Sequence, residues 1–328
     1  MNNQKIELKP VDFKPFIHGN YEFTDRDGYV GFCHFSKKQT DYLKFNEFFY
    51  RRAFFSSSVT LEFRFKKQCV FSFDYKIADV SSKDSLEVFV NGKRAYFLKI
   101  AEMKSEGTLE FCVRGDENNV GGALDEAVVY FPIDADFAIK NFKASAEIFK
   151  IDRAPKVLWI GDSISQGYGT FSSGESFVNI IRRKMGFELL NQGIGGYYYD
   201  CNSIIPLENF VPDRIIIAMG TNLHDWADKE KYISAFYKKL SEVYGGVKTL
   251  SITPLWRFDE NVKPEEMKLT RELIKEQCDK YNTICLNAKD FIPPEEKYFI
   301  DGLHPNAAGA EIYADKVCER LIKTKFFN

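Results

Sequence analysis

The sequence predicts a two-part fold, in which an all-β sandwich precedes an α/β domain with a parallel sheet. Residues 1 to about 150 contain short alternating apolar runs that are separated by turn residues. After about residue 152, short apolar runs alternate instead with segments of helical spacing. Alternating strands and helices favour a parallel sheet with helices on both faces. With a linker near Asp152-Arg153-Ala154-Pro155, we expect a sandwich domain over residues 1–150 and an α/β domain over residues 151–328.

The whole chain contains 31 Phe and 17 Tyr, which favours a strand-rich portion, and the strand patterns lie in the first half. Asn91-Gly92 is a hairpin signal, because both residue types tolerate the positive φ of a tight turn. Short strands between turn signals indicate a β-sandwich of jelly-roll type, and no helix of note is expected there. The expected strands are Val70–Tyr75, Leu86–Val90, Tyr96–Ile100, Leu109–Val113, Val128–Pro132 and Phe142–Ile148.

In the second half, the continuous apolar run Arg214–Met219 is typical of a strand buried on both faces. Pro264 suits the first turn of a helix, and Asn306 suits the N-cap of another. The expected strands are 156–160, 188–191, 214–219, 247–252 and 283–286, and the expected helices are 175–185, 229–244, 264–281 and 306–323.

Bulk composition excludes several classes of protein. The net charge is −2, so no basic field favours nucleic acid. No apolar stretch approaches the roughly 20 residues that span a bilayer, so no membrane partner is expected. The N-terminus lacks the apolar core of a secretion signal, which favours the cytoplasm. The seven scattered Cys indicate reduced thiols. The oligomeric state is left open.

Candidate functional groups follow four predicted strands. Ser163 follows the first strand, Gly193–Gly196 the second, Asn222 the third and Trp256 the fourth. In open α/β sheets, ligands bind beyond the carboxyl ends of the strands. Four separate segments therefore bring polar groups to one edge of the sheet.

Ser163, His304 and Asp301 are the candidate catalytic residues. A serine hydroxyl is a poor nucleophile until a base accepts its proton, and His304 is the candidate base. Asp301 lies three residues before His304, so its carboxylate can reach Nδ1 of that imidazole and leave Nε2 facing Ser163. For an oxyanion hole we expect the backbone N–H groups of Ser163 and Gly196 and the side-chain amide of Asn222.

Four aromatic residues, Tyr168, Tyr197, Trp226 and Trp256, are possible substrate contacts, because aromatic faces suit the apolar faces of sugar rings. Packing in the core or in loops explains these residues about equally well. Trp159 lies inside a predicted buried strand and is expected in the core.

Other site types do not fit the sequence. No Lys-Ser/Thr follows the glycines after Gly161, so a P-loop is excluded, and Tyr198 occupies the third glycine position of a dinucleotide fingerprint. No paired-Cys or His-Glu-x-x-His pattern is present. We therefore expect no metal and no cofactor.

Four segments together resemble the SGNH (GDSL) hydrolase superfamily: Gly-Asp-Ser-Ile-Ser, Asn-Gln-Gly-Ile-Gly-Gly, Gly-Thr-Asn and Asp-Gly-Leu-His-Pro. The resemblance covers roughly residues 155–325 and implies a flavodoxin-like sheet and ester hydrolysis through an acyl-enzyme. Ser163, Gly196, Asn222 and His304 match the four namesake residues, and Asp301 matches the triad acid. Leu223 departs from many members, which carry Asp there. A sandwich before such a domain resembles carbohydrate esterase family 2.

The resemblance implies a serine esterase that removes a small acyl group, most plausibly acetyl, from a carbohydrate. The partner would be a small-molecule or oligosaccharide ester. An acyltransferase, or a hydrolase of lipid or other acyl esters, would use the same residues. The alternative of another class is a carbohydrate-binding protein without activity.

Overall fold

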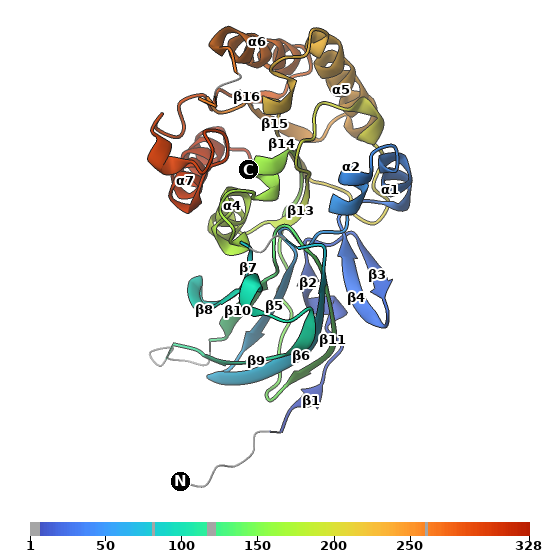
Figure 1. The fold of residues 1–328 in the computed structure, drawn as a ribbon, viewed down its shortest axis with the longest axis vertical. Helices are drawn as coiled ribbons and strands as arrows, with labels where there is room; N and C mark the ends of the chain where they lie inside the picture. Colours follow the sequence, from blue (N-terminus) through green and yellow to red (C-terminus); the bar gives the residue numbers. More distant parts are fainter. Residues whose placement is uncertain (1–6, 81–82, 117–122, 260–261) are drawn as a thin grey trace.

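The computed structural model describes residues 7–80, 83–116, 123–259 and 262–328. Two antiparallel sheets form a sandwich in the first half, and one parallel sheet with helices forms the second (Figure 1). Within the described residues, no helix is both long and apolar enough to cross a bilayer.

The first sheet of the sandwich has the strand order β3-β4-β11-β6-β9, with β1 paired to β11, and the second has the order β2-β5-β10-β7-β8. The strands of the first sheet are β1 (Lys9–Pro10), β3 (Glu22–Arg26), β4 (Tyr29–Cys33), β6 (Gln68–Ala78), β9 (Glu106–Arg114) and β11 (Asp136–Ala144). Those of the second are β2 (Ile17–His18), β5 (Thr60–Phe65), β7 (Ser85–Val90), β8 (Lys93–Lys99) and β10 (Asp125–Tyr130). The expected sandwich is confirmed, and the β7–β8 turn at Asn91-Gly92 has positive φ at both residues.

Aromatic side chains fill the space between these two sheets. The Phe63 and Phe71 rings meet edge to face at 5.2 Å, and Phe71 lies 5.3 Å from Phe111. Such contacts stabilise a core beyond the area they bury. Eleven of the 31 Phe residues lie in the sandwich core.

The expectation of no helix of note in the first half is wrong. Helices α1 (Lys37–Leu43) and α2 (Glu47–Arg52) follow β4 and lie between the sandwich and the second half (Figure 1). Ser36 begins α1 with a capping box, in which its side chain accepts from the Gln39 N–H and the Gln39 side chain accepts from the Ser36 N–H. Short helices of this kind depend on their caps rather than on a long apolar period.

The parallel sheet has the strand order β13-β12-β14-β15-β16, as in flavodoxin-like folds. Its strands are β12 (Lys156–Gly161), β13 (Glu188–Gly193), β14 (Arg214–Ala218), β15 (Lys248–Ile252) and β16 (Ile284–Leu286). The helices are α3 (Ser163–Gln166), α4 (Phe177–Met185), α5 (Lys229–Tyr244), α6 (Pro264–Lys280) and α7 (Ala307–Lys323). Helices α4 and α7 cover one face, and α5 and α6 cover the other. The predicted fold class of this half is confirmed, and Trp159 is fully buried in its core.

Buried charges join the two halves. Glu62 of β5 is fully buried and pairs with Arg182 of α4 and, at 2.7 Å, with Arg153. Burial favours the neutral acid, but Arg182, His18 and Arg153 outweigh it and hold the pKa of Glu62 well below its usual range. The division of the chain near residue 150 remains a prediction, since α1 and α2 also contact the second half.

Candidate active site

Ser163 is the first residue of α3, directly after β12. The chain turns sharply here, and Gly161 permits the turn: a Cβ at this position would lie 2.1 Å from the Ser165 hydroxyl and 2.8 Å from the Ala218 carbonyl oxygen. Asp162 caps α3 by accepting the Ile164 N–H at 3.0 Å. The Ser163 hydroxyl is therefore held at the carboxyl end of the sheet, where ligands bind in this class of fold.

His304 lies within hydrogen-bond distance of Ser163. Its Nε2 is 2.8 Å from Ser163 Oγ, and its Nδ1 is 2.7 Å from Asp301 Oδ2. The other carboxylate oxygen of Asp301 accepts the backbone N–H groups of Leu303 and His304. Partial burial of Asp301 favours its neutral form, but these hydrogen bonds outweigh it and hold the pKa of its carboxyl below the usual value. The three side chains form one hydrogen-bonded chain, as their order in the sequence predicts.

The loop that carries Asp301 and His304 is closed on itself. Phe299 and Pro305 form an isolated bridge at its base, and the Ile300 N–H donates to the His304 carbonyl at 2.9 Å. Gly302 at its tip has φ +77°, which glycine adopts without strain. The short spacing between Asp301 and His304 is thus fixed by the backbone as well as by their side chains.

The three predicted oxyanion donors lie around the same space. Gly196 is exposed, has φ +75°, and belongs to a turn after β13. Asn222 follows β14, and its Nδ2 donates to the Tyr197 carbonyl at 2.8 Å, which leaves one amide hydrogen. In the described part of the chain, the backbone N–H groups of Ser163 and Gly196 donate to no protein acceptor. Three donors are therefore available for a developing oxyanion beside Ser163.

Burial raises the pKa of Asp162, the acid that precedes the candidate nucleophile. Asp162 is 2% exposed, and this burial raises the pKa of its carboxyl to about 7, although the N–H groups of Ile164 and Ser165 favour the ionised form. Since the folded-state pKa lies above that of the unfolded chain, the contribution of Asp162 to stability is present at acid pH and is lost as the pH rises towards 7.

A cavity of about 380 Å³ opens in front of Ser163 and His304. Its wall includes residues that the sequence did not single out: Phe48 and Arg52 of α2, Asp134, Gln166 and Leu303. Phe48 is 47% exposed, and the Arg52 guanidinium lies 3.5 Å from the centre of its ring. No sequence pattern marks Phe48, Arg52 and Asp134 as functional, because they reach the site only through the contact between the two halves.

Of the four aromatic residues predicted to contact substrate, Tyr168 lines this cavity, with its ring 4.7 Å from that of His304. For Tyr197 the prediction is corrected: its side chain is 3% exposed, packs edge-on against Phe49 at 5.0 Å and donates to Asp200. It is the Tyr197 carbonyl that faces the site.

The two tryptophans are also placed elsewhere. Trp226 packs between Tyr198 and Tyr232, at 4.9 and 5.0 Å, and Trp256 packs against Phe258 at 5.2 Å. Neither is among the described residues that line the cavity. Both rings pack in loops, the alternative that the sequence left open, and their substrate contacts remain a prediction.

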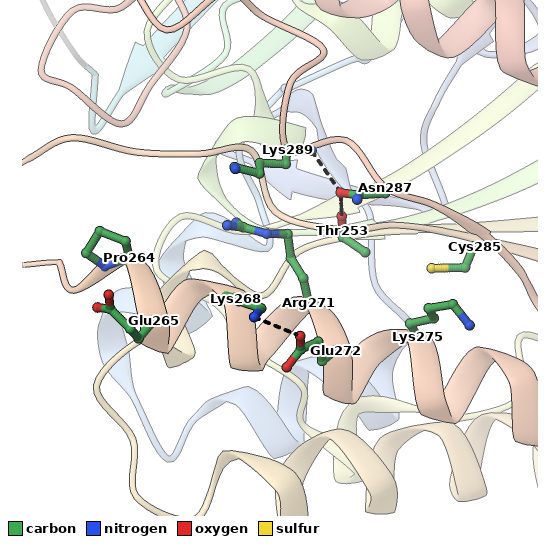
Figure 2. Close-up of a pocket in the computed structure, with 10 residues that line it drawn as sticks. All are labelled: Thr253, Pro264, Glu265, Lys268, Arg271, Glu272, Lys275, Cys285, Asn287 and Lys289. Atoms are coloured by element: carbon green, nitrogen blue, oxygen red, sulfur yellow. Dashed lines mark hydrogen bonds and ion pairs between the residues drawn. The ribbon is translucent and has the colours of Figure 1, made fainter.

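A second cavity is larger, about 570 Å³, but lies between α6 and the ends of β15 and β16 (Figure 2). Its lining includes Thr253, Arg271, Cys285, Asn287 and Lys289, and Figure 2 shows Arg271 and Lys289 extending into the same space. None of the Ser163–His304–Asp301 chain borders it. We place the candidate site in the smaller cavity, because only there do a nucleophile, a base and free donors converge.

Among the described residues, no three His, Cys, Asp or Glu side chains are grouped as metal ligands would be. His224 lies 3.1 Å from the Thr221 carbonyl and 3.9 Å from Asp225.

Comparison with known proteins agrees with this geometry. Residues 159–312 match the model of the GDSL-like Lipase/Acylhydrolase family. The match lies wholly within the second half of the chain. The matched residues include Ser163, Gly196, Asn222, Asp301 and His304. No curated protein sequence matches the chain.

Solved structures share both halves of the fold with this chain. Salicylyl-acyltransferase SsfX3 from a tetracycline biosynthetic pathway superposes with a TM-score of 0.74 at 17% identity, over 97% of this chain and 98% of that one. A family two carbohydrate esterase from Clostridium thermocellum, in complex with cellohexaose, gives 0.64 at 15% identity over 94% and 99%. The acetyl xylan esterase Est2A from Butyrivibrio proteoclasticus gives 0.64 at 13% over 98% and 100%. At these identities the likeness shows the fold.

Proposed function

We propose that the protein is a serine esterase that hydrolyses small acyl esters through an acyl-enzyme. The observation that carries this proposal is the hydrogen-bonded chain from Ser163 through His304 to Asp301, which opens into a cavity beside three free N–H donors. A nucleophile, an oriented base and an oxyanion hole are the parts that acyl transfer needs.

In the proposed reaction, Ser163 Oγ attacks the ester carbonyl carbon while His304 Nε2 accepts its proton. The N–H groups of Ser163 and Gly196 and the Asn222 amide stabilise the tetrahedral oxyanion. The imidazolium then protonates the leaving alkoxide, and the acyl-enzyme remains. A water molecule then attacks the acyl carbon while His304 accepts its proton. The tetrahedral intermediate that results collapses, the acid leaves, and the His304 imidazolium returns the proton to Ser163 Oγ. Asp301 holds the imidazole with Nε2 towards the serine throughout.

We further propose an acetyl group on a carbohydrate as the substrate. Two of the structural neighbours are carbohydrate esterases, one of them an acetyl xylan esterase, which supports this class. The exposed rings of Phe48 and Tyr168 offer apolar faces to a sugar, and Arg52 and Asp134 offer hydrogen bonds to its hydroxyl groups. Arg52 and Asp134 carry opposite charges, so together they add no net charge to this wall of the cavity. This favours a neutral substrate over an anionic one.

The test is hydrolysis of p-nitrophenyl acetate, butyrate and octanoate by the wild type and by Ser163→Ala, followed by acetate release from acetylated xylo-oligosaccharides. We expect turnover that needs Ser163, is fastest with acetate and extends to the oligosaccharide. Preference for octanoate would overturn the acetyl assignment. Equal activity of wild type and Ser163→Ala on every ester would overturn the esterase and favour a binding protein.

Acyl transfer is the second candidate, because the structural neighbour SsfX3 is described as an acyltransferase. In that reaction an acceptor hydroxyl, rather than water, attacks the same acyl-enzyme. Adding a soluble polyol such as xylobiose to the acetate assay separates the two reactions. Acetylated acceptor as the main product would favour the transferase, and free acetate would favour the hydrolase.

A further inference from the structure

The turn that carries Gly196 can hold its N–H in two directions. The Tyr197 N–H donates to the Ile194 carbonyl at 3.1 Å and closes a four-residue turn with Gly195 and Gly196 at its centre. Gly196 has φ +75° and Gly195 does not have a positive φ, which is the pattern of a type II turn. A flip of the peptide between the two glycines would give a type I turn and reverse the Gly196 N–H. Two adjacent glycines oppose this flip only weakly.

Gln166 holds one side of this turn. Its Oε1 accepts the Gly195 N–H at 2.7 Å, and its Nε2 donates to Asp134 Oδ1 at 3.1 Å. Since an N–H needs an oxygen and a carboxylate needs a donor, the two partners fix the orientation of the amide. Gln166 is 3% exposed and lies on the same helical turn as Ser163. One buried amide therefore connects the nucleophile helix with the oxyanion turn.

Asp134 brings the first half of the chain into this connection. It lies just before β11, and its backbone N–H donates to the Asp84 carboxylate at 2.7 Å. Its side chain is 18% exposed and 3.9 Å from the Arg52 guanidinium. The Ser57 hydroxyl also donates to the Gln166 carbonyl at 2.6 Å. The sandwich half thus holds Gln166 through both its side chain and its backbone.

From this connection we propose that Gln166 is a positioning residue, which anchors the turn through the Gly195 N–H, in the peptide next to the one that can flip, so that the Gly196 N–H faces the reacting carbonyl. Asp134 fixes the Gln166 amide, so the sandwich half acts on the oxyanion turn and is part of the machinery that stabilises the transition state. This inference rests on the proposed function, since it concerns the oxyanion of acyl transfer. It gives the first half a role beyond holding a glycan.

The first test is Gln166→Leu, which removes both hydrogen bonds with little change in volume. Loss of one oxyanion donor costs about 10²–10³ in kcat, so we expect a fall of that order with KM for p-nitrophenyl acetate changed less than about threefold. The matched control is Gln39→Leu. Gln39 is 2% exposed and also joins the halves, by donating to Gln192 and to the Ser203 carbonyl, but it does not touch the turn. Its kcat should stay within about twofold of wild type.

The second test is Gln166→Glu, which can still accept the Gly195 N–H but places a carboxylate against Asp134. Two carboxylates at this distance share one proton, and one pKa rises. Arg52, Asp84 and Asp79 are the other charged groups that face Asp134; burial already raises the Asp134 pKa, Arg52 opposes the rise, and Asp79 adds to it. Activity relative to wild type should therefore be highest at acid pH and fall as the pH rises.

Adding Asp134→Asn to Gln166→Glu should restore activity at every pH, because the asparagine amide can donate to the new carboxylate. Asp134→Asn alone is the reference for the double variant, since its amide oxygen still accepts from Gln166. Restoration by the double change would exclude misfolding as the cause of the single variant's loss. A double variant as inactive as Gln166→Glu, or a Gln166→Leu variant with wild-type kcat, would overturn the inference.

Phosphorylation of Ser163 by diethyl p-nitrophenyl phosphate separates this inference from the proposed function. The reagent also develops an oxyanion, so the p-nitrophenol burst should be slower in Gln166→Leu by about the same factor as kcat. If the wild type reacts with this reagent but hydrolyses no ester, the proposed function fails while the burst still tests Gln166. An equal burst rate in wild type and Gln166→Leu would overturn the inference alone.

Discussion

One wall of the 380 Å³ cavity is built from loops of the second half, with Ser163, Asn222 and His304, and the other from Phe48, Arg52 and Asp134 of the first half. The first wall is held by hydrogen bonds of 2.7–2.8 Å within and between short loops at one sheet edge. The second is held by the docking of the two halves of the chain. The proposed nucleophile and base therefore belong to the first wall, and the contacts of Phe48 and Arg52 with substrate belong to the second.

From this difference we expect substitutions in the two walls and between the halves to change different quantities: kcat, KM and stability. Changes in the loop wall should lower kcat and leave stability little changed. Changes in Phe48 and Arg52, the α2 residues of the second wall (the α2 wall), should act on KM. Changes in the buried charges between the halves should act on stability. Four substitutions separate these effects.

The largest effect is expected for Asp301→Asn. An amide would no longer hold the tautomer of His304 that accepts a proton from Ser163, and equivalent changes in other serine hydrolases lower kcat by about 10⁴. Ester turnover measures it, and thermal unfolding should change little. The control is Asp315→Asn, because Asp315 is an exposed acid that pairs with Lys184. Equal kcat in the two variants would remove Asp301 from the mechanism.

Next in size is Arg182→Met, which tests the docking of the two walls. It leaves the fully buried Glu62 with one fewer cation, and breaking such a pair costs about 3–5 kcal/mol of unfolding free energy. Adding Glu62→Leu should recover part of the loss, since no uncompensated carboxylate remains. Urea unfolding followed by tryptophan fluorescence measures both. A single variant as stable as wild type would mean that these charges do not hold the interface.

A smaller effect concerns the pH dependence of that interface. The pKa of Glu62 is lowered in the folded state, so its contribution is present above the unfolded pKa near 4.5 and is lost as the pH falls below it. In Glu62→Gln, the unfolding free energy should fall less steeply below pH 4.5 than in the wild type. The two slopes should differ by up to about 1.4 kcal/mol per pH unit, the contribution of one titrating group. Unfolding free energies at pH 3, 4, 5 and 7 measure it; parallel curves for the two proteins would contradict the assignment.

The smallest effect is expected for Phe48→Ala in the α2 wall. Removing the ring takes away a substrate contact of roughly 1 kcal/mol, so KM for acetylated xylo-oligosaccharide should rise about fivefold with kcat nearly unchanged. Phe45→Ala is the matched control: Phe45 is 53% exposed and precedes α2, but does not line the cavity. A similar KM change in both variants would assign the effect to packing of the segment.

The loop wall could be predicted from sequence because each of its parts is local. Asp301 and His304 are three residues apart, and Ser163 and Asn222 each follow a strand whose apolar run marks the sheet edge. The α2 wall could not, because Arg52 and Asp134 meet the site through contacts between distant segments. One signal was present for its neighbour: Ser36 and Gln39 have the spacing of a capping box and mark the start of α1. Nothing comparable indicates which way Phe48 faces.

The error over Tyr197 has a similar cause. Residues 197–199 lie in a loop without a regular period, so the sequence does not indicate which rings face solvent and which pack inward. Tyr197 turns its ring to Phe49 and its carbonyl to Asn222, so the backbone rather than the side chain serves the site. In such loops, sequence predicts that a residue is near the chemistry but not which of its atoms is used.

The strand order of the parallel sheet has a consequence for association. Strand β13 is an outer strand, and unpaired backbone groups on an outer strand invite another chain to add to the sheet. The first half lies against it: Asn191 donates to the Ser58 hydroxyl, Gln192 donates to the His34 carbonyl, and His18 pairs with Glu188. The other outer strand, β16, is only three residues long. The sandwich therefore also shields the sheet against edge-to-edge aggregation.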